Sequence, residues 1–152
     1  MLRITPFLWF DTEAEEAMNH YMSIFKHSKV LSVSRANGKV MSVSFELEGQ
    51  KIMALNAGPL FKFTEAISLF VSCETQEEVD ELWAKLSEGG ESGRCGWLKD
   101  KFGLSWQVVP TALPKLMNDP HPARSKAVVQ AMLAMNKIVI DDLKNAYNSV
   151  AN

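Results

Sequence analysis

The sequence predicts an α+β fold in which two paired β-α-β-β-β units are followed by a helical C-terminal tail. Two amphipathic helical segments each follow a strand-like run, and glycine-containing turns separate the strand-like runs after each helix. The run Leu104 to Val109 alternates behind a tight turn that ends at Gly103. Alternation places one set of side chains on a core and the other on a second surface. Glycine readily adopts the positive φ that a tight hairpin requires.

The first unit is predicted over residues 2–57. Thr12 begins its helix, and Glu15 completes a capping box in which each side chain bonds the other residue's backbone N–H. Asn37-Gly38 and Glu48-Gly49 are hairpin turns that separate the later strands. The strands of this unit are predicted at residues 4–10, 29–35, 39–48 and 50–56.

The second unit, over residues 66–110, repeats this order. Thr75 begins its helix with a second capping box closed by Glu78, and Gly89-Gly90 ends the helix. The turn that begins at Asp100 is expected to be solvated. The strands are predicted at residues 66–73, 91–95, 96–100 and 104–109.

The two halves align in more than element order. Superposing the acidic first turns of the two helices aligns their apolar faces. Superposing Gly49 on Gly103 aligns Met53 with Gln107. The two superpositions differ in register, so an insertion or deletion between them is required. With a period of roughly 55 residues and only two copies, one shared sheet is a better interpretation than a solenoid.

The tail is predicted to be helical over residues 113–152. Short helices are expected near 111–117, 123–135 and 141–147, with the breaks between them at proline-rich and polar segments. The predicted organisation is therefore one domain over residues 1–112 and a C-terminal helical extension that packs on it or on a partner subunit.

Composition excludes several functional classes. The formal net charge is -2, which provides no basic face for nucleic acid. No apolar run approaches the roughly 20 residues of a membrane span, and the N-terminal segment lacks the pattern of a signal peptide. Two cysteines, Cys73 and Cys95, are too few for a disulfide scaffold, so a reducing cytoplasmic location is expected.

Four segments carry a family resemblance: ITPFLWFD, EAEEAMNHYMSIF, TQEEVDELWAKL and, above all, CGWLKDKFGLSWQVVP. Over about residues 2–112 the chain resembles the vicinal oxygen chelate superfamily, which has the glyoxalase/bleomycin-resistance fold. Within it the chain most resembles the PhnB-like group, also labelled 3-demethylubiquinone-9 3-methyltransferase domains. The resemblance implies two curved sheets that form a cleft, often in a homodimer.

The label also implies methyl transfer, for which the sequence offers no recognisable machinery. An S-adenosylmethionine site usually requires a glycine-rich strand-to-helix loop on a parallel sheet. The sequence contains no G-x-G-x-x-G segment, and its predicted strands follow one another through hairpins.

The resemblance also raises the question of a metal site. Metal-dependent relatives use His, Glu or Gln on the first and last strands of each unit, and Gln107 matches one such position where Glu is usual. The corresponding last-strand residue of the first unit is Met53. The first-strand spans 4–8 and 66–69 contain no His, Asp or Glu. Since a divalent site needs three or four suitable ligands, we expect a site without metal or other cofactor.

Candidate ligand-binding residues lie on the predicted strands of both units. Gln107 either orients a ligand or satisfies buried backbone groups. Its neighbour Trp106 faces the opposite way and packs under the helices. Cys95 is a candidate nucleophile or, in the favoured interpretation, a small thiol that lines the cleft. The candidate ligand-binding residues are Phe7, Phe45, Met53, Cys95, Trp97 and Gln107.

These observations favour a cytoplasmic, homodimeric protein that binds a small, partly apolar molecule in a metal-free cleft. One alternative is an enzyme of the same superfamily, either a lyase or isomerase or the methyltransferase of the family label. Another is a structural role in which the cleft is vestigial and the C-terminal helices form an interaction surface.

Overall fold

The computed structural model describes residues 1–151. The chain divides into two compact units, residues 1–63 and the residues from 64 onward. Each unit begins with the order β-α-β-β-β, and three further helices follow in the second unit. The α+β class and the repeated order of elements are therefore confirmed.

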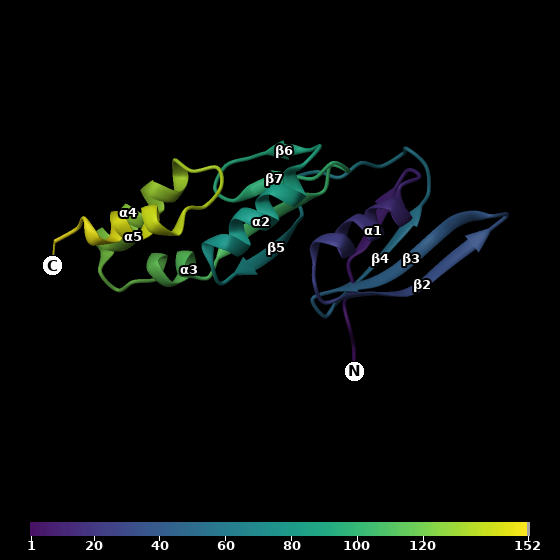
Figure 1. Ribbon diagram of the computed structural model, residues 1–152, viewed down its shortest axis with the longest axis horizontal. Coiled ribbons are helices and arrows are strands. Elements are labelled where there is room, and N and C mark those ends of the chain that lie inside the picture. The colour runs from purple at the N-terminus through teal and green to yellow at the C-terminus, as the bar shows by residue number, and fades with distance from the viewer. Residues whose placement is uncertain (152) are drawn as a thin grey trace. The chain divides into compact units, whose positions relative to one another are not determined.

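The first unit is a four-stranded mixed sheet with one helix (Figure 1). Its elements are β1 (Phe7–Phe10), α1 (Ala14–Ile24), β2 (Ser28–Ala36), β3 (Lys39–Leu47) and β4 (Gln50–Asn56). The strands lie in the order β1-β4-β3-β2, and only the β1–β4 pair is parallel. Both predicted hairpin turns are present, with Asn37-Gly38 and Glu48-Gly49 all at positive φ. Two consecutive positive φ values give a turn whose twist matches that of the flanking strands.

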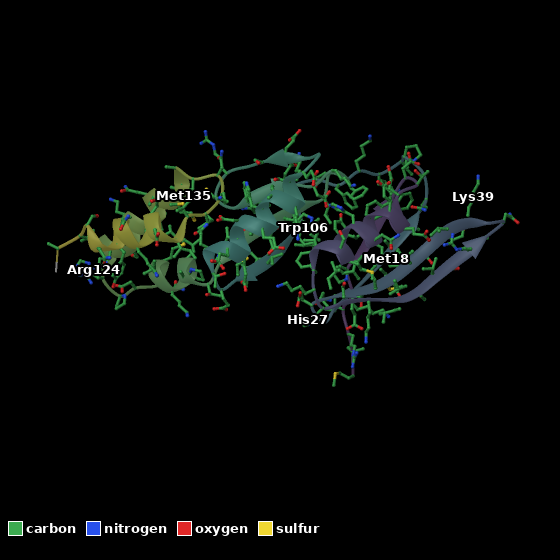
Figure 2. The ribbon with its side chains drawn as sticks, in the orientation of Figure 1. Met18, His27, Lys39, Trp106, Arg124 and Met135 are labelled. Atoms are coloured by element: carbon green, nitrogen blue, oxygen red, sulfur yellow. The ribbon has the colours of Figure 1, made fainter. Side chains whose placement is uncertain are left out.

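The core of the first unit lies between α1 and one face of the sheet. Phe45 belongs to this core: it is 1% exposed, and the neighbouring alternate residues of β3 are buried with it. The prediction that Phe45 contacts a ligand is therefore corrected, because the pleat of β3 turns its ring toward α1. Met18 of α1, labelled in Figure 2, is another member. The buried residues of this layer include Leu8, Phe10, Ala14, Ala17, Met18, Tyr21, Val43, Phe45, Leu47, Ile52 and Ala54.

The start of α1 differs from the sequence-based expectation. Thr12 and Glu15 do not form a capping box, since the N-cap residue is Glu13 and no side chain of the cap bonds the helix. Instead, the side-chain Oδ1 of Asn56 accepts a hydrogen bond from the Ala14 N–H at 2.8 Å. Because β4 runs parallel to β1, its C-terminal residue lies beside the start of α1. A residue distant in sequence thus satisfies a helix-terminal donor.

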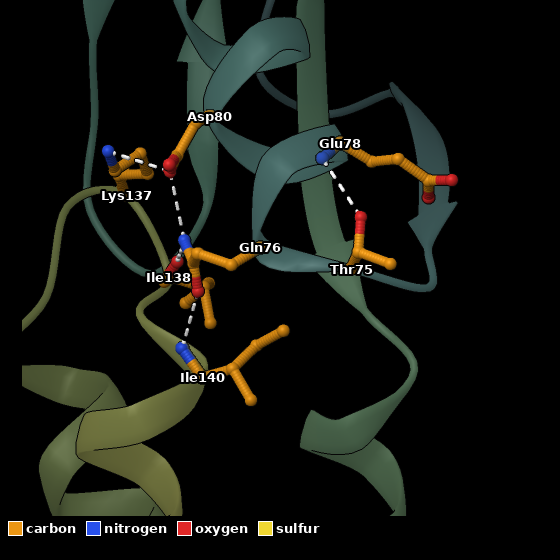
Figure 3. A network of polar contacts seen from close by, with 7 residues as sticks. All are labelled: Thr75, Gln76, Glu78, Asp80, Lys137, Ile138 and Ile140. Carbon is orange, nitrogen blue, oxygen red and sulfur yellow. Dashed lines mark hydrogen bonds and ion pairs between the residues drawn. The ribbon is translucent and has the colours of Figure 1, made fainter.

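The second unit repeats this plan. Its elements are β5 (Ser68–Cys73), α2 (Gln76–Ser87), β6 (Glu91–Ser92), β7 (Trp97–Lys99) and β8 (Ser105–Pro110). The strands lie in the order β5-β8-β7-β6, and only the β5–β8 pair is parallel. The predicted cap of α2 is confirmed, because Thr75 Oγ1 accepts from the Glu78 N–H at 3.2 Å (Figure 3). The Glu78 carboxylate returns to the backbone at Glu74 N–H, 2.7 Å away.

Three helices follow β8 and build a small core of their own. They are α3 (Ala112–Met117), α4 (Pro122–Leu133) and α5 (Ile140–Asn148), close to the predicted positions. The buried members of this core are Val109, Leu113, Val128, Ile138 and Leu143. Val109 lies on β8, so the helices pack onto the end of the second sheet. The division into a domain of residues 1–112 and a separate extension stays a prediction.

A glutamine at the start of α2 ties these helices to the second sheet (Figure 3). Gln76 Oε1 accepts from the Ile140 N–H at 2.7 Å, and its Nε2 donates to the Ile138 carbonyl at 3.0 Å. The same Nε2 donates to Asp80 Oδ1 at 2.9 Å, and Asp80 pairs with Lys137 Nζ at 2.8 Å. The segment between α4 and α5 is therefore held at its backbone and by an ion pair. Among residues 1–151, no helix is long and apolar enough to cross a membrane.

Candidate functional site

Each sheet packs against its own helix with one face, and four of the candidate residues, Phe7, Met53, Trp97 and Gln107, lie on the other. In β1, Leu8 and Phe10 are buried toward α1, whereas Phe7, which alternates with them, is 53% exposed. In β5, Phe70 is 57% exposed. We call the sheet face that carries Phe7 and Met53 the open face of the first sheet. The face that carries Phe70, Gln107 and Trp97 is the open face of the second sheet.

The strand registers place equivalent residues at equivalent points of the two open faces. Phe7 pairs with Met53 across β1 and β4, and Phe70 pairs with Gln107 across β5 and β8. Each pair joins the first and last strands of its unit, so Met53 and Gln107 are structural counterparts, as their alignment predicts. The two phenylalanines are counterparts as well.

Gln107 lies at the centre of the open face of the second sheet. It has Phe70 on β5 as one cross-strand partner and Trp97 on β7 as the other. Its side-chain Nε2 donates to Ser68 Oγ at 3.0 Å, whereas no residue of the described chain donates to its Oε1. The result is a row of two aromatic rings with an amide between them, in which one amide oxygen remains available as an acceptor.

The orientation of Gln107 depends on a buried carboxylate at the preceding turn. Asp100 is 2% exposed, which corrects the expectation that it is solvated. Its Oδ1 accepts from the backbone N–H groups of Phe102 and Leu104 at 2.8 and 3.0 Å. Its Oδ2 accepts from Trp106 Nε1 at 2.9 Å. Trp106 is 2% exposed and so packs on the α2 side, and the alternation of β8 then directs Gln107 to the open face.

A second, more polar row crosses the same open face one pleat away. Ser105 of β8 has Ser68 on β5 and Lys99 on β7 as its cross-strand partners. Lys99 forms an ion pair with Glu65, which precedes β5. The hydrogen bond to Glu65 raises the pKa of Lys99, and the same contact lowers the pKa of Glu65.

Sequence reasoning missed Phe70 and the residues of this polar row. Superposing the first turns of the two helices aligns Phe7 with Leu69, which lies on the helix-facing side of β5. The structure instead matches Phe7 with Phe70, one residue further along. A shift of one residue exchanges the two faces of a strand. The signal that identifies Phe70 is the alignment of Met53 with Gln107. Phe7 pairs with Met53 on the parallel strand, so its counterpart is the residue that pairs with Gln107, which is Phe70.

Cys95 lies in the loop before β7, outside the paired rows. Its φ is 57°, and its backbone N–H donates to the Met135 carbonyl at 2.9 Å. The adjacent Gly96 N–H donates to the Asn136 carbonyl at 2.8 Å, so this loop is tied to the C-terminal helices. Its predicted contact with a ligand stays a prediction. Cys73 is fully buried, and burial raises the pKa of its thiol to about 11.

The residues at the equivalent strand positions do not fit a divalent metal. In the first sheet these positions hold Phe7 and Met53, and in the second they hold Phe70 and Gln107. One thioether and one amide do not make the set of hard or borderline ligands that such a metal requires. Across residues 1–151, no three His, Cys, Asp or Glu side chains gather into a group that could hold a metal ion.

A family model described as 3-demethylubiquinone-9 3-methyltransferase matches residues 2–109. The chain belongs to this family. The match includes both β-α-β-β-β units up to Val109, one residue before the end of β8, and the three C-terminal helices lie outside it. No curated protein matches the chain.

Solved structures agree with this assignment. The PhnB protein of Bacillus cereus, which bears the same methyltransferase description, is 39% identical, with a TM-score of 0.69 over 72% of this chain and 100% of its own. Protein PA1353 from Pseudomonas aeruginosa is 21% identical, with a TM-score of 0.61 over 72% and 98% of the two chains. The fosfomycin resistance protein FosX from Listeria monocytogenes, complexed with Mn(II) and sulfate, is 14% identical, with a TM-score of 0.52 over 71% and 89%. The latter two show that the fold is shared and that one such protein binds small ions.

The strand-to-helix connections do not form the glycine-rich loop that usually binds S-adenosylmethionine, the cofactor implied by the family description. The strand-to-helix loops are residues 11–13 and 74–75, and neither contains glycine. The glycines at positive φ include those of the hairpin turns at 38, 49 and 103. A glycine-rich loop at a helix N-terminus, the usual support for a nucleotide cofactor, is therefore not formed by these connections.

Proposed function

We propose that this protein binds a small, partly apolar molecule on the open face of the second sheet, without a metal. The row Phe70–Gln107–Trp97 is the observation that carries the proposal. An exposed phenylalanine and a partly buried tryptophan on either side of one amide resemble the usual lining of a ligand site, in which apolar surface provides affinity and a few polar groups provide orientation.

The polar groups of the row are arranged for directional recognition. The bond from Gln107 Nε2 to Ser68 Oγ holds the amide in one orientation, and no described residue donates to its Oε1. Trp97 is partly buried, and no hydrogen bond of the described residues uses its indole N–H. A ligand with one donor and one acceptor on an apolar body would satisfy both groups.

The open face of the first sheet supports the same kind of ligand. Phe7 is 53% exposed beside Met53, and Trp9 stacks edge-on against Phe61 with ring centroids 4.9 Å apart. The Ser44 and Ser32 hydroxyls bond each other at 2.9 Å on the neighbouring strands. We place Trp97, Gln107 and the newly found Phe70 in the proposed site on the second unit, and we propose Phe7 and Met53 as a separate candidate surface on the first unit. We place Cys95, in the loop before β7, at the edge of the proposed site on the second unit.

The proposal includes a homodimer in the cytoplasm, as the family resemblance implies. Both cysteines are free thiols, which a reducing compartment preserves. Light scattering of the intact protein after size-exclusion chromatography should give twice the chain mass of 17.0 kDa. A monomer at micromolar concentration would contradict this part of the proposal.

A thermal-shift screen of small aromatic compounds tests binding, and glutamine variants test the site. Gln107→Leu keeps the side-chain size but removes the amide, so it should abolish the shifts caused by the hits. Gln130→Leu, at an exposed position on α4, is the matched control and should leave them unchanged. If Gln107→Leu preserves every shift, Gln107 has no role in binding. Tight stoichiometric binding of Mn²⁺ or Ni²⁺ in calorimetry would contradict the metal-free site.

The family description favours one second candidate, methyl transfer. Calorimetry with S-adenosylmethionine separates it from the first. Stoichiometric binding of this cofactor, followed by methylation of a hydroxylated quinone, would establish the enzyme and displace the simple binding role. We expect no heat of binding, since neither strand-to-helix loop provides the glycine-rich cradle.

A further inference from the structure

The polar row beside Gln107 contains a buried hydroxyl without a partner. Ser105 is 1% exposed, and its Oγ forms no hydrogen bond with any of the described residues. A buried polar group without a partner is costly, and such groups in native proteins usually have one. The strand register places this hydroxyl on the open face, between Ser68 and Lys99. The missing partner is therefore expected on that face.

A cation lies directly opposite this hydroxyl. Lys99 pairs with Ser105 across β7 and β8, so both side chains lie on the open face. Lys99 already binds a carboxylate, because its ammonium forms an ion pair with Glu65. The pair demonstrates that the position accepts an anion.

The ion pair with Lys99 holds the carboxylate of Glu65 only weakly. Its side chain is 62% exposed, and it lies in the segment before β5 rather than in the sheet. Exposed ion pairs add little to stability because solvent screens them and side-chain freedom is lost. An external carboxylate can therefore replace Glu65 on Lys99 at small cost.

We propose that Lys99 and Ser105 bind the carboxylate of the ligand, whose apolar body lies on Phe70 and Trp97. The incoming carboxylate displaces Glu65 from Lys99 and accepts a hydrogen bond from the Ser105 hydroxyl. This inference rests on the proposed function and adds the class of ligand, an aromatic carboxylic acid.

The spacing of the rows sets the size of this ligand. The polar row and the aromatic row are two residues apart along β8, which corresponds to about 7 Å. A carboxylate attached to a fused bicyclic aromatic ring spans this separation. The Gln107 amide lies on the aromatic row, where it meets the edge of the ring or a polar substituent on it.

The competing account is that Lys99 and Glu65 only clamp the connector before β5. Two probes of the same shape separate the accounts: 2-naphthoate carries a carboxylate, and 2-naphthamide carries a neutral amide. Both are titrated into the ¹⁵N-labelled intact protein. The indole N–H resonance of Trp97, assigned from its loss in Trp97→Phe, reports binding at the site.

The proposal predicts that 2-naphthoate binds about tenfold or more tightly than 2-naphthamide, since charge-assisted hydrogen bonds are the stronger kind. Lys99→Gln should remove this difference, and Lys126→Gln, at an exposed position on α4, should preserve it. Ser105→Ala should weaken 2-naphthoate alone. Glu65→Gln should strengthen 2-naphthoate several-fold, because it removes the competing carboxylate. The amide spectrum of each variant verifies its fold.

Three results would overturn the inference in different ways. If the two probes bind with equal affinity and Lys99→Gln changes neither affinity, Lys99 and Ser105 do not form a carboxylate site, but the proposed binding function still holds. Absence of binding by either probe at millimolar concentration contradicts both the inference and the proposed function for aromatic ligands. If Glu65→Gln does not strengthen 2-naphthoate, the displacement of Glu65 is wrong.

Discussion

The carboxylate of Asp100 should be a large single contributor to the stability of the second unit. Its two oxygens accept from two backbone N–H groups of the turn and from the Trp106 indole, all at 2.8–3.0 Å. The carboxylate is 2% exposed, so water cannot replace these bonds. Asp100→Asn keeps the shape of the side chain, but it must present an NH₂ group to one set of donors.

The magnitude follows from the bonds that change. With the asparagine oxygen toward the two backbone donors, the amide N–H groups face the indole N–H of Trp106. The variant then loses one charge-assisted hydrogen bond and leaves a buried donor without a partner. Each such effect contributes about 1–3 kcal/mol, so Asp100→Asn should lower the free energy of unfolding by about 2–6 kcal/mol. Asp11→Asn, at an exposed position, should change it by less than about 0.5 kcal/mol.

Urea denaturation of a double-mutant cycle tests the mechanism as well as the size. Trp106→Phe removes the indole donor, so the donor-to-donor contact is absent in the double variant. The cost of Asp100→Asn should therefore be about 1–2 kcal/mol smaller in the Trp106→Phe background. Additive effects of the two substitutions, or a loss below about 0.5 kcal/mol in Asp100→Asn alone, would show that the Asp100–Trp106 bond does not stabilise the unit in this way.

Three further predictions concern other parts of the chain. Gln76→Ala should lower the free energy of unfolding by about 1–3 kcal/mol and speed amide exchange in the segment between α4 and α5, while Gln130→Ala should do neither. Thr75→Ala removes the cap of α2, so it should lower the free energy of unfolding by about 1 kcal/mol in urea denaturation. An equal decrease in Thr12→Ala would mean that a capping box forms at the start of α1. Burial raises the pKa of Cys73 to about 11 from an ordinary value of 9.0, so the thiol of the unfolded chain loses its proton at lower pH than the thiol of the folded chain. The free energy of unfolding should therefore fall as the pH rises from 9.0 to about 11. Cys73→Ala should flatten that part of the pH profile, and an unchanged slope would assign it to other groups.

Local features of the sequence predicted the elements that depend on neighbouring residues. The turns Asn37-Gly38 and Glu48-Gly49 adopt the expected positive φ values, and the Thr75 cap forms as predicted. Both kinds of feature are decided within a few residues by steric freedom or by a side chain that reaches its own backbone. The same local logic failed at Thr12, because Asn56 from β4 provides the acceptor instead.

The face to which a strand residue points was harder to predict. Phe45, a predicted ligand-binding residue, is a core residue, and Phe70, which was not among the candidates, is 57% exposed. In β3 the alternation of Val43, Phe45 and Leu47 with polar residues marks the side toward the helix, whereas β5 carries apolar residues on both faces and its composition does not. A one-residue difference between the repeats then exchanges the faces.

The turn that begins at Asp100 has some features that the local sequence predicts and others that depend on the folded structure. The hairpin turn and the alternating strand with Trp106 and Gln107 could be predicted from the sequence, because Gly103 and the period of two are local properties. The burial of Asp100 against the indole and the position of Gln107 between Phe70 and Trp97 depend on how the folded strands pair and pack. The Phe70–Gln107 pair joins β5 and β8, which are far apart along the chain. The Asp100–Trp106 bond is local in sequence, but burial by the rest of the unit makes it strong.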